Sequence, residues 1–333
     1  MRIVSMETAP PADDKGVFDA RYLAFLETVT SLRPKLHRYC ARMTGSVLDG
    51  EDVVQEALFH AYRKLDTFDD ARPLAPWLFR IAHNHCIDFL RRRGVRIEAE
   101  TAAAREAEPA ASANPGPSEL PGLPIGRAVE HLVLTLPPKE RACVLLKDVF
   151  DYSLEEIAEL VESTVGGVKA ALSRGRAKLA AATPETPATP AARQPAPETN
   201  GHMRRLLQQY VQRFNARDWE GVRSLITADA RVRVVDRAYL RNCREFMEAP
   251  IESLKSTPYF GQYSRMPPTW RFVVADIDGE TAIVRLRRDG ARWTPAFLIR
   301  VEIADDQTHL RQISDYSHCP WVIDAANVIT LDE

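Results

Sequence analysis

Basic side chains near the middle of the chain are the residues whose type and spacing point most clearly to a chemistry. Between residues 163 and 179 there are four cations and no acidic residue: Lys169, Arg174, Arg176 and Lys178. Cations along one helix neutralise phosphates and release their counterions, and forked donors pair with base edges. This stretch therefore predicts a helix that binds DNA.

A shorter acidic helix is expected immediately before this basic helix. Ser153 and Glu156 have the spacing of a capping box, and apolar residues recur at helical spacing up to residue 161. Together with the apolar run that follows Leu136-Pro137-Pro138, these segments predict a helix-turn-helix. Two alternatives are a basic face that is only solvated and a helix-turn-helix that never meets DNA. The segregation of charge favours DNA, because acidic residues gather before the turn and cations after it.

Two further amphipathic helices are expected in the first third of the chain. Residues 48–65 combine an apolar stripe with acidic residues at the start, where the helix dipole favours carboxylates. In residues 77–93, apolar side chains alternate at helical spacing with a polar set: Arg80, Asn84, Arg91, Arg92 and Arg93. From the residues alone, these are well-formed amphipathic helices. The run His83-Asn84-His85-Cys86 is not predicted to bind metal, because adjacent ligands on one helix point in different directions.

Residues 48–65 and 77–93 resemble region 2 of bacterial RNA polymerase sigma factors of the extracytoplasmic-function (ECF) type, and residues 136–179 resemble region 4. The order and spacing of the blocks agree with that family over about half the chain. The resemblance implies two all-α domains: a region 2 helical bundle at 18–95 and a region 4 helix-turn-helix at 127–182, joined by a linker at 96–126.

The resemblance also implies roles for individual residues. Asp52, Gln55 and Glu56 match the helix end that docks on the clamp helices of the largest polymerase subunit. The loop at residues 67–74 matches the one that captures a base flipped from the non-template strand.

The same resemblance assigns the DNA contacts. In the helix that reads the −10 element, the candidates are Arg80, His83, Asn84, Arg91 and Arg92, with Asn84 suited to a base edge. In the helix that reads the −35 element, they are Thr164, Lys169, Ser173, Arg174 and Arg176. Lys169 is early enough in the helix to reach bases, whereas Arg174 and Arg176 are expected to hold phosphates. Gly166, Gly167 and Gly175 weaken this helix intrinsically.

Composition agrees with a multidomain cytoplasmic protein. The chain has 333 residues and a formal net charge of −2, so its cations are concentrated locally. Its five cysteines form no C-x-x-C pair, which predicts free thiols in a reducing compartment. We find no secretory leader and no apolar run long enough to cross a bilayer, and we expect no metal or other cofactor.

A Pro- and Ala-rich linker at 183–201 precedes a third domain at 202–333. Two amphipathic helices, one ending near Phe214 and one containing residues 219, 222, 225 and 226, precede a strand at 230–235. Four alternating segments follow as strands: 270–275, 281–287, 296–303 and 310–314. This order predicts an α+β cone with a curved antiparallel sheet. The opening, residues 210–232, resembles SnoaL-like domains, which belong to the nuclear-transport-factor-like superfamily.

Some relatives of that fold perform acid/base chemistry in the cone. Candidate groups here are Asp236 and the run Asp315-Tyr316-Ser317-His318, with Phe297, Trp293 and Trp321 lining a pocket or an interface. Titratable residues at strand ends are more often simply surface groups, and the sigma-like half already supplies a complete function. We therefore assign no catalytic residues and expect the domain to be regulatory.

The sequence thus predicts a sigma factor that gives core RNA polymerase its promoter specificity. An anti-sigma factor or a small ligand of the C-terminal domain is left open as a partner, and no membrane is expected. Two alternatives remain: a helix-turn-helix regulator independent of polymerase, and an enzyme or ligand sensor with a tethered DNA-binding module.

Overall fold

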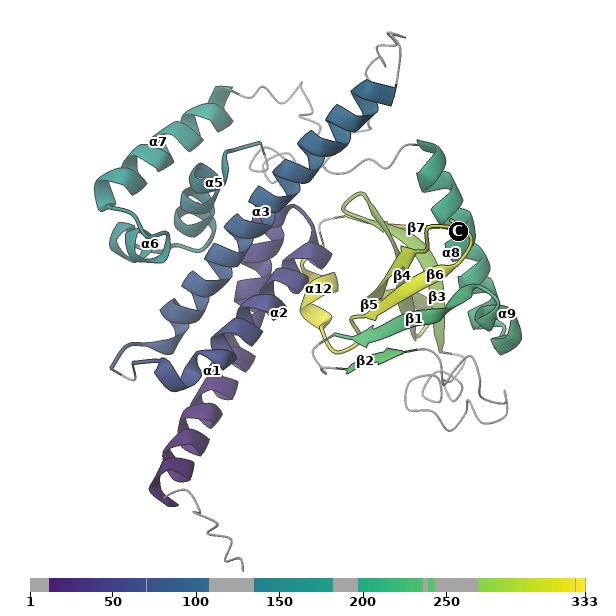
Figure 1. The fold of residues 1–333 in the computed structure, drawn as a ribbon, viewed down its shortest axis with the longest axis horizontal. Helices are drawn as coiled ribbons and strands as arrows, with labels where there is room; N and C mark the ends of the chain where they lie inside the picture. The colour runs from purple at the N-terminus through teal and green to yellow at the C-terminus, as the bar shows by residue number, and fades with distance from the viewer. Residues whose placement is uncertain are drawn as a thin grey trace, which may run out of the picture. The chain divides into compact units, whose positions relative to one another are not determined.

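The computed structural model describes residues 12–69, 71–107, 135–181, 197–235, 239–242, 269–326 and 328–332 (Figure 1). By their contacts these residues form two compact units. The first comprises the helices of residues 12–44, 52–107 and 136–181. The second comprises residues 45–51 and the α+β part that begins at residue 197.

Three long helices make up the first half of the N-terminal unit: α1 (Ala12–Thr44), α2 (Val47–Arg63) and α3 (Leu74–Ala107), with a 3-10 turn, η1 (Leu65–Thr67), after α2. The apolar stripe of α2 is buried, as its helical spacing predicts: Val53, Val54, Ala57, Leu58 and Ala61. α3 continues to Ala107, into the stretch at 96–126 that was predicted as a linker.

The second half of the N-terminal unit contains α5 (Pro138–Val144), a π-helical turn η2 (Leu145–Val149), α6 (Leu154–Leu160) and α7 (Val165–Ala181). Pro138 is accepted at the start of α5 because the first turn needs no amide donor there. The capping box is confirmed: the Glu156 amide donates to the Ser153 hydroxyl at 3.1 Å, and the Ser153 amide donates to the Glu156 carboxylate at 2.7 Å.

The C-terminal unit begins with α8 (Pro197–Asn215) and α9 (Trp219–Arg223) and contains a sheet of seven strands in the described residues. The strands are β1 (Ile226–Val234), β2 (Tyr239–Asn242), β3 (Trp270–Ile277), β4 (Glu280–Asp289), β5 (Arg292–Ile303), β6 (Leu310–Asp315) and β7 (Ile329–Leu331), and a short helix, α12 (Pro320–Asp324), precedes β7. Their order in the sheet is β2-β1-β6-β5-β4-β3-β7.

The prediction of an α+β domain is confirmed, but the sheet is mixed and not purely antiparallel. β1 runs parallel to β6, with Val232 beside Ile313, while the other pairs are antiparallel. Alternation along a strand reports which face is buried and carries no information on strand direction. Residue 226, placed in a helix from its spacing, begins β1 because α9 ends at Arg223. Similarly, α8 begins at Pro197, inside the predicted linker.

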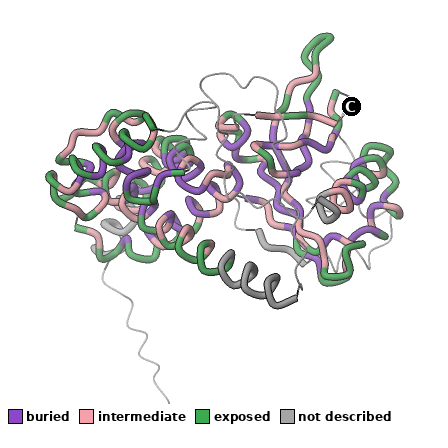
Figure 2. Tube along the Cα trace, turned by 90° about the horizontal axis from the view of Figure 1, so that it is seen from above, coloured by how far each residue is buried: buried purple, intermediate pink, exposed green. Residues whose placement is uncertain are grey.

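One apolar core joins α8 and α9 to residues of the sheet. Along the trace of the chain, buried positions alternate with intermediate and exposed ones (Figure 2). Phe214 of α8 stacks edge-on against Phe272 of β3, with ring centres 5.0 Å apart. The next residue, Asn215, forms two hydrogen bonds with the Phe272 backbone, at 2.8 and 2.9 Å. Arg204, also on α8, pairs with Asp276 of β3 and with Asp332 near the chain end. The helix is therefore fixed to the sheet at several points.

Within these ranges, no helix is long and apolar enough to span a membrane. The same residues contain no group of three or more His, Cys, Asp and Glu side chains placed to hold a metal ion. The four described cysteines, Cys40, Cys86, Cys143 and Cys319, are buried thiols without disulfide partners, and Cys243 lies outside the described residues.

Candidate nucleic-acid interface

The turn between α6 and α7 places the start of the basic helix at the surface. Glu162 adopts a left-handed backbone conformation, with φ of 48°, which reverses the chain after α6. Thr164 then caps α7, since its hydroxyl accepts the Gly167 amide at 3.0 Å. Thr164, predicted as a DNA contact, is exposed and serves as this cap.

One face of α7 is solvent-exposed and the opposite face packs into the unit. Lys169 and Ser173, four residues apart, are exposed, while Val168, Ala171 and Leu172 are buried. Within the described part of the chain, the Lys169 ammonium has no ion-pair partner. Its charge is therefore available to a ligand outside the protein, as the sequence predicts for a residue that reaches bases.

The other cations of α7 are paired inside the same unit. Arg174 and Lys178 both bind the carboxylate of Glu140 on α5, at 2.9 and 2.8 Å. Arg176 binds Asp148 through its Nε at 3.2 Å. Donation by Lys178, and next by Arg174, lowers the pKa of Glu140 below its ordinary value. These ion pairs fix the orientation of α7. Arg174 and Arg176, which were predicted to hold phosphates, thus each have a carboxylate partner within the protein.

Gly175 marks a close approach of α7 to α5. A Cβ at this position would lie 2.9 Å from Val144 Cγ2, which is closer than van der Waals contact permits, and 3.6 Å from Glu140 Cβ, which is an ordinary contact. The glycine is thus explained by helix packing, although it lowers helix propensity. At Gly166 a Cβ would meet only the Thr164 hydroxyl, at 3.9 Å.

This difference gives a matched pair of variants. We expect Gly175→Ala to destabilise the region by about 1–3 kcal/mol through overpacking. Gly166→Ala should leave stability unchanged or raise it by up to about 1 kcal/mol, because alanine favours the helix. Urea unfolding followed by circular dichroism compares the two. Equal midpoints for both variants would contradict the packing role of Gly175.

In α3, Arg80 and Asn84 are four residues apart and share one face of the helix. Asn84 is exposed and Arg80 is half-buried. Arg91, further along α3, pairs with Asp88 at 3.2 Å, and both side chains are more than half exposed. This surface is consistent with the DNA contacts predicted for α3.

His83 is a correction to the predicted DNA contacts. Its side chain is buried, with 6% of the residue exposed, and its Nδ1 lies 2.7 Å from the hydroxyl of Tyr39 on α1. Spacing alone placed it beside Arg80 and Asn84, but a step of one residue turns a helix by about 100° and directs the side chain inward. His83 therefore joins α1 to α3 and does not face DNA in this structure.

Burial lowers the pKa of His83 from 6.5 to about 4. The unfolded chain then binds more protons than the folded chain between these values, so stability falls as pH falls through this window. The loss of stability from this residue amounts to about 3 kcal/mol by pH 4.

We expect His83→Gln to flatten the pH dependence of the melting temperature between pH 6.5 and 4.5. The control is His318→Gln, at an exposed position, which should not flatten it. Parallel profiles for wild type and His83→Gln would contradict this assignment.

The loop before α3 is anchored by aromatic packing. Phe68 and Trp77 have ring centres 4.6 Å apart, and the Asp69 carboxylate accepts the Ala71 amide at 3.1 Å. Asp70 lies outside the described residues. The loop therefore holds exposed polar groups next to an aromatic pair.

The surface of α2 carries the predicted polymerase contacts. Asp52 and Gln55 are half-buried and Glu56 is exposed. Glu56 lies 3.7 Å from His85 and 3.6 Å from Arg92, so a predicted polymerase contact and a predicted DNA contact are neighbours.

Sequence reasoning missed Phe59 on this surface. Its side chain is 64% exposed and borders a surface pocket of about 530 Å³ that Glu56, His60, Arg63, Lys64 and His85 also line. The sequence could have indicated Phe59, because it is an aromatic residue outside the apolar stripe of α2. Exposed aromatic groups beside charges often mark protein interfaces.

Regions 2 and 4 are packed together within the N-terminal unit. Arg141 of α5 is buried, and its guanidinium donates to the carbonyl of Met43 in the last turn of α1 and to that of Leu136, the latter at 3.1 Å. Burial lowers the pKa of Arg141 to about 10. Phe79 of α3 lies beside Tyr152, with ring centres 5.5 Å apart. The two regions that are expected to read separate promoter elements are therefore in direct contact.

In the C-terminal unit, the acid/base candidates differ in their exposure. The buried Asp315 accepts the Ser317 amide at 2.7 Å within its own turn, Tyr316 is buried and His318 is exposed. Asp236 lies outside the described residues.

The three aromatic candidates of this unit are divided among different surroundings. Phe297 belongs to the core, Trp293 stacks with Arg271, and Trp321 donates to Glu51 at 2.8 Å.

A transcription factor with two separate DNA-binding regions is the class of protein that these helices define. Residues 28–96 match the family model for sigma-70 region 2, and residues 126–179 match that for sigma-70 region 4. The ECF RNA polymerase sigma factor SigW of Bacillus subtilis is 35% identical over 163 residues, which cover 47% of this chain and 87% of SigW. The chain belongs to the ECF family of RNA polymerase sigma factors.

The ECF sigma factor SigG of Mycobacterium tuberculosis is 31% identical over 245 residues, which cover 66% of this chain and 62% of SigG. Because residues 1–179 are little more than half of the 333-residue chain, this alignment extends beyond region 4. The crystal structure of the M. tuberculosis ECF sigma factor SigJ aligns with 87% of this chain and 95% of that one, at 17% identity and a TM-score of 0.31.

Proposed function

We propose that this sigma factor binds core RNA polymerase through Asp52, Gln55 and Glu56 and contacts promoter DNA through two helices. In α3 the contacts to the −10 element are Arg80, Asn84, Arg91 and Arg92. In α7 the contacts to the −35 element begin with Lys169 and Ser173, while Arg174 and Arg176 orient the helix and lie near the phosphates. The observation that carries the proposal is the exposed Lys169 on a helix whose other cations are paired internally.

Opening of the start site fits the loop before α3. Melting costs a few kcal/mol for each unstacked base, and single-strand contacts must offset this cost. The Phe68–Trp77 pair supports the loop, and Asn84 and Arg80 are on the helix that follows it.

The contact between regions 2 and 4 has a consequence for promoter binding. Elements centred at −35 and −10 are roughly 85 Å apart along B-form DNA, at 3.4 Å per base. A compact unit of this size is on the order of 40 Å across. Region 4 therefore leaves region 2, breaking the contact of Arg141 with Met43, before both elements are bound at once.

The C-terminal unit, in this proposal, regulates the sigma regions and performs no reaction. The whole protein acts in the cytoplasm, where core polymerase and the chromosome are. Run-off transcription on a promoter library, comparing the full chain with a chain ending near residue 183, tests both parts. Specific transcripts from either form support the sigma function, and a difference in yield gives the sign of the regulation. If neither form gives transcripts, the proposal is wrong.

A further inference from the structure

The hairpin of β4 and β5 extends beyond its neighbours in the sheet. The last pair between β3 and β4 joins Trp270 to Arg287, whereas β4 and β5 stay paired as far as the turn between them. On the other side, β6 pairs with β5 only from Ile299 onward. Among the described strands, the tip at residues 288–293 therefore pairs only within the hairpin. This tip is a two-stranded ribbon, a shape that the major groove of DNA admits.

Arginine is concentrated on this ribbon and on the start of the adjacent strand β3. We call the four exposed residues the ribbon arginines: Arg271, Arg287, Arg288 and Arg292. Between positions 281 and 301 the only acidic residue is Asp289. The surface is therefore strongly cationic, although the net charge of the whole chain is −2.

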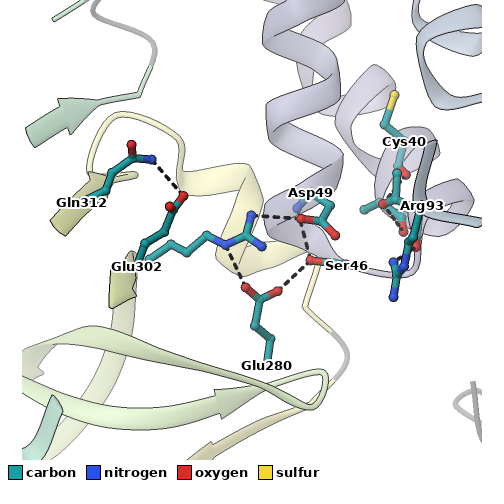
Figure 3. Close-up of polar contacts among 10 residues, drawn as sticks. Cys40, Ser46, Asp49, Arg93, Glu280, Glu302 and Gln312 are labelled. Atoms are coloured by element: carbon teal, nitrogen blue, oxygen red, sulfur yellow. Dashed lines mark hydrogen bonds and ion pairs between the residues drawn. The ribbon is translucent and has the colours of Figure 1, made fainter. Parts of the chain in front are cut away.

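Elsewhere on the same strands, charged side chains are neutralised within the C-terminal unit. Arg300 on β5 pairs with Glu280 at 2.8 Å, and Glu302 accepts the side-chain amide of Gln312 at 3.1 Å (Figure 3). The ribbon arginines differ, because none of them forms an ion pair with a residue that the structure describes. Their positive charges are available to an anion outside the protein.

Contacts within the hairpin orient these guanidinium groups. Arg271 lies over the ring of Trp293, 4.8 Å from its centre, and Arg287 lies 6.0 Å from the centre of the Trp270 ring. The Nε of Arg288 donates to a carbonyl of the turn at 3.1 Å. Restricting a side chain in advance reduces the entropy that it loses when a ligand binds. A planar guanidinium can then bind a phosphate through two parallel hydrogen bonds.

The rest of the exposed surface favours a polyanion over a membrane. A surface that inserts into a bilayer carries exposed apolar side chains. In the described part of the C-terminal unit no large apolar side chain is exposed, since those that are exposed all belong to the N-terminal unit. In addition, the sequence has no lysine after residue 255, so the cations here are arginines, which match phosphate in geometry as well as in charge.

We infer that the ribbon arginines bind the phosphates of duplex DNA, so that the C-terminal unit has a DNA-binding surface of its own. The contact is made to the backbone and reads no sequence, because every base carries the same phosphate. This inference goes beyond the proposed function, in which α3 and α7 alone contact DNA.

The test measures the affinity of the full chain for a labelled duplex of random sequence, by fluorescence anisotropy at about 50 mM salt and without polymerase. Arg287, Arg288 and Arg292 are replaced together by glutamine, and we expect the affinity to fall about tenfold or more. Each phosphate contact contributes about 0.9 to the slope of log affinity against log salt concentration, so the triple variant should lose between roughly two and three units of slope.

The matched control replaces Arg205, Arg231 and Arg311 by glutamine. These exposed arginines lie on α8, β1 and β6, and their removal changes the net charge by the same amount. The control should keep the DNA affinity and the salt dependence of the wild type. Equal losses of affinity in both triple variants overturn the inference, because binding then follows net charge. Unchanged affinity in the ribbon variant, or no binding of the duplex by the wild type, also overturns it.

A second measurement uses the wild-type chain and so does not depend on the folding of a variant. Phenylglyoxal modifies accessible arginines, and mass spectrometry reports the extent of modification at each position. Excess duplex should protect Arg287, Arg288 and Arg292 and leave Arg205 reactive. Equal reactivity of the ribbon arginines with and without duplex overturns the inference. Protection by vesicles of anionic phospholipid and not by duplex also overturns it and identifies a lipid surface as the ligand. None of these results alters the roles proposed for α3 and α7.

Discussion

Replacing Lys169 by alanine is expected to reduce transcription from −35-dependent promoters roughly tenfold, while the affinity for core polymerase stays unchanged. A base or phosphate contact from one cation contributes about 1–3 kcal/mol to specific binding. Lys169 is exposed on α7 and has no internal counterion among the described residues, unlike Arg174, Arg176 and Lys178. Its removal therefore costs DNA binding without disturbing an ion pair within the protein. Transcript yield and core binding are measured on the same preparations.

The control for this experiment is Lys139→Ala. Lys139 is an exposed lysine of the same region, on α5 and outside the recognition helix. It should retain wild-type yield. Equal losses of transcript yield for Lys139→Ala and Lys169→Ala would show that the yield follows net charge. A loss of core-polymerase binding in Lys169→Ala would contradict its role as a DNA contact.

Replacing Asp52, Gln55 and Glu56 together by alanine should weaken core binding roughly 30-fold or more, because the loss of even one central interface residue costs about 2 kcal/mol. The three side chains are polar and lie at the surface or partly buried on α2, while its apolar stripe forms the core. Their loss should therefore leave the fold intact, which an unchanged melting temperature would verify. Competition with another sigma factor for purified core polymerase gives the affinity.

A single exposed carboxylate elsewhere in the unit serves as the control for the triple variant. Glu27→Ala on α1 changes the charge at an exposed position outside α2. Wild-type core affinity in the triple variant would remove α2 from the polymerase interface and favour a helix-turn-helix regulator that works without polymerase.

Local signals predicted much of the fold. The capping box of Ser153 and Glu156, the apolar stripe of α2 and the alternation in β3 to β6 each depend on residues close in sequence. The direction of β1 beside β6 was not predictable in this way, since these strands are distant in the chain and alternation is the same in both directions.

The candidate site was predicted less completely, because its errors concern charged residues that are buried. Arg141 and Glu51 belong to residue types that are usually exposed, and His83 was predicted as a DNA contact, yet all three are buried. Each instead meets a partner from a distant segment: the carbonyl of Met43, the indole of Trp321 and the hydroxyl of Tyr39. No pattern within a single helix specifies such a partner. The exposed residues Lys169 and Asn84, by contrast, need only helical spacing to be placed, and they are accessible as expected.

The measurement that most directly tests the central claim is permanganate mapping of unpaired thymines on a promoter selected from the transcription library. With core polymerase and this chain both present, thymines around the start site should become reactive, and with either component alone they should stay paired. The same pattern should weaken when Lys169 is replaced by alanine. Reactivity that is identical with and without the chain, or that appears with the chain in the absence of polymerase, would contradict its function as a sigma factor.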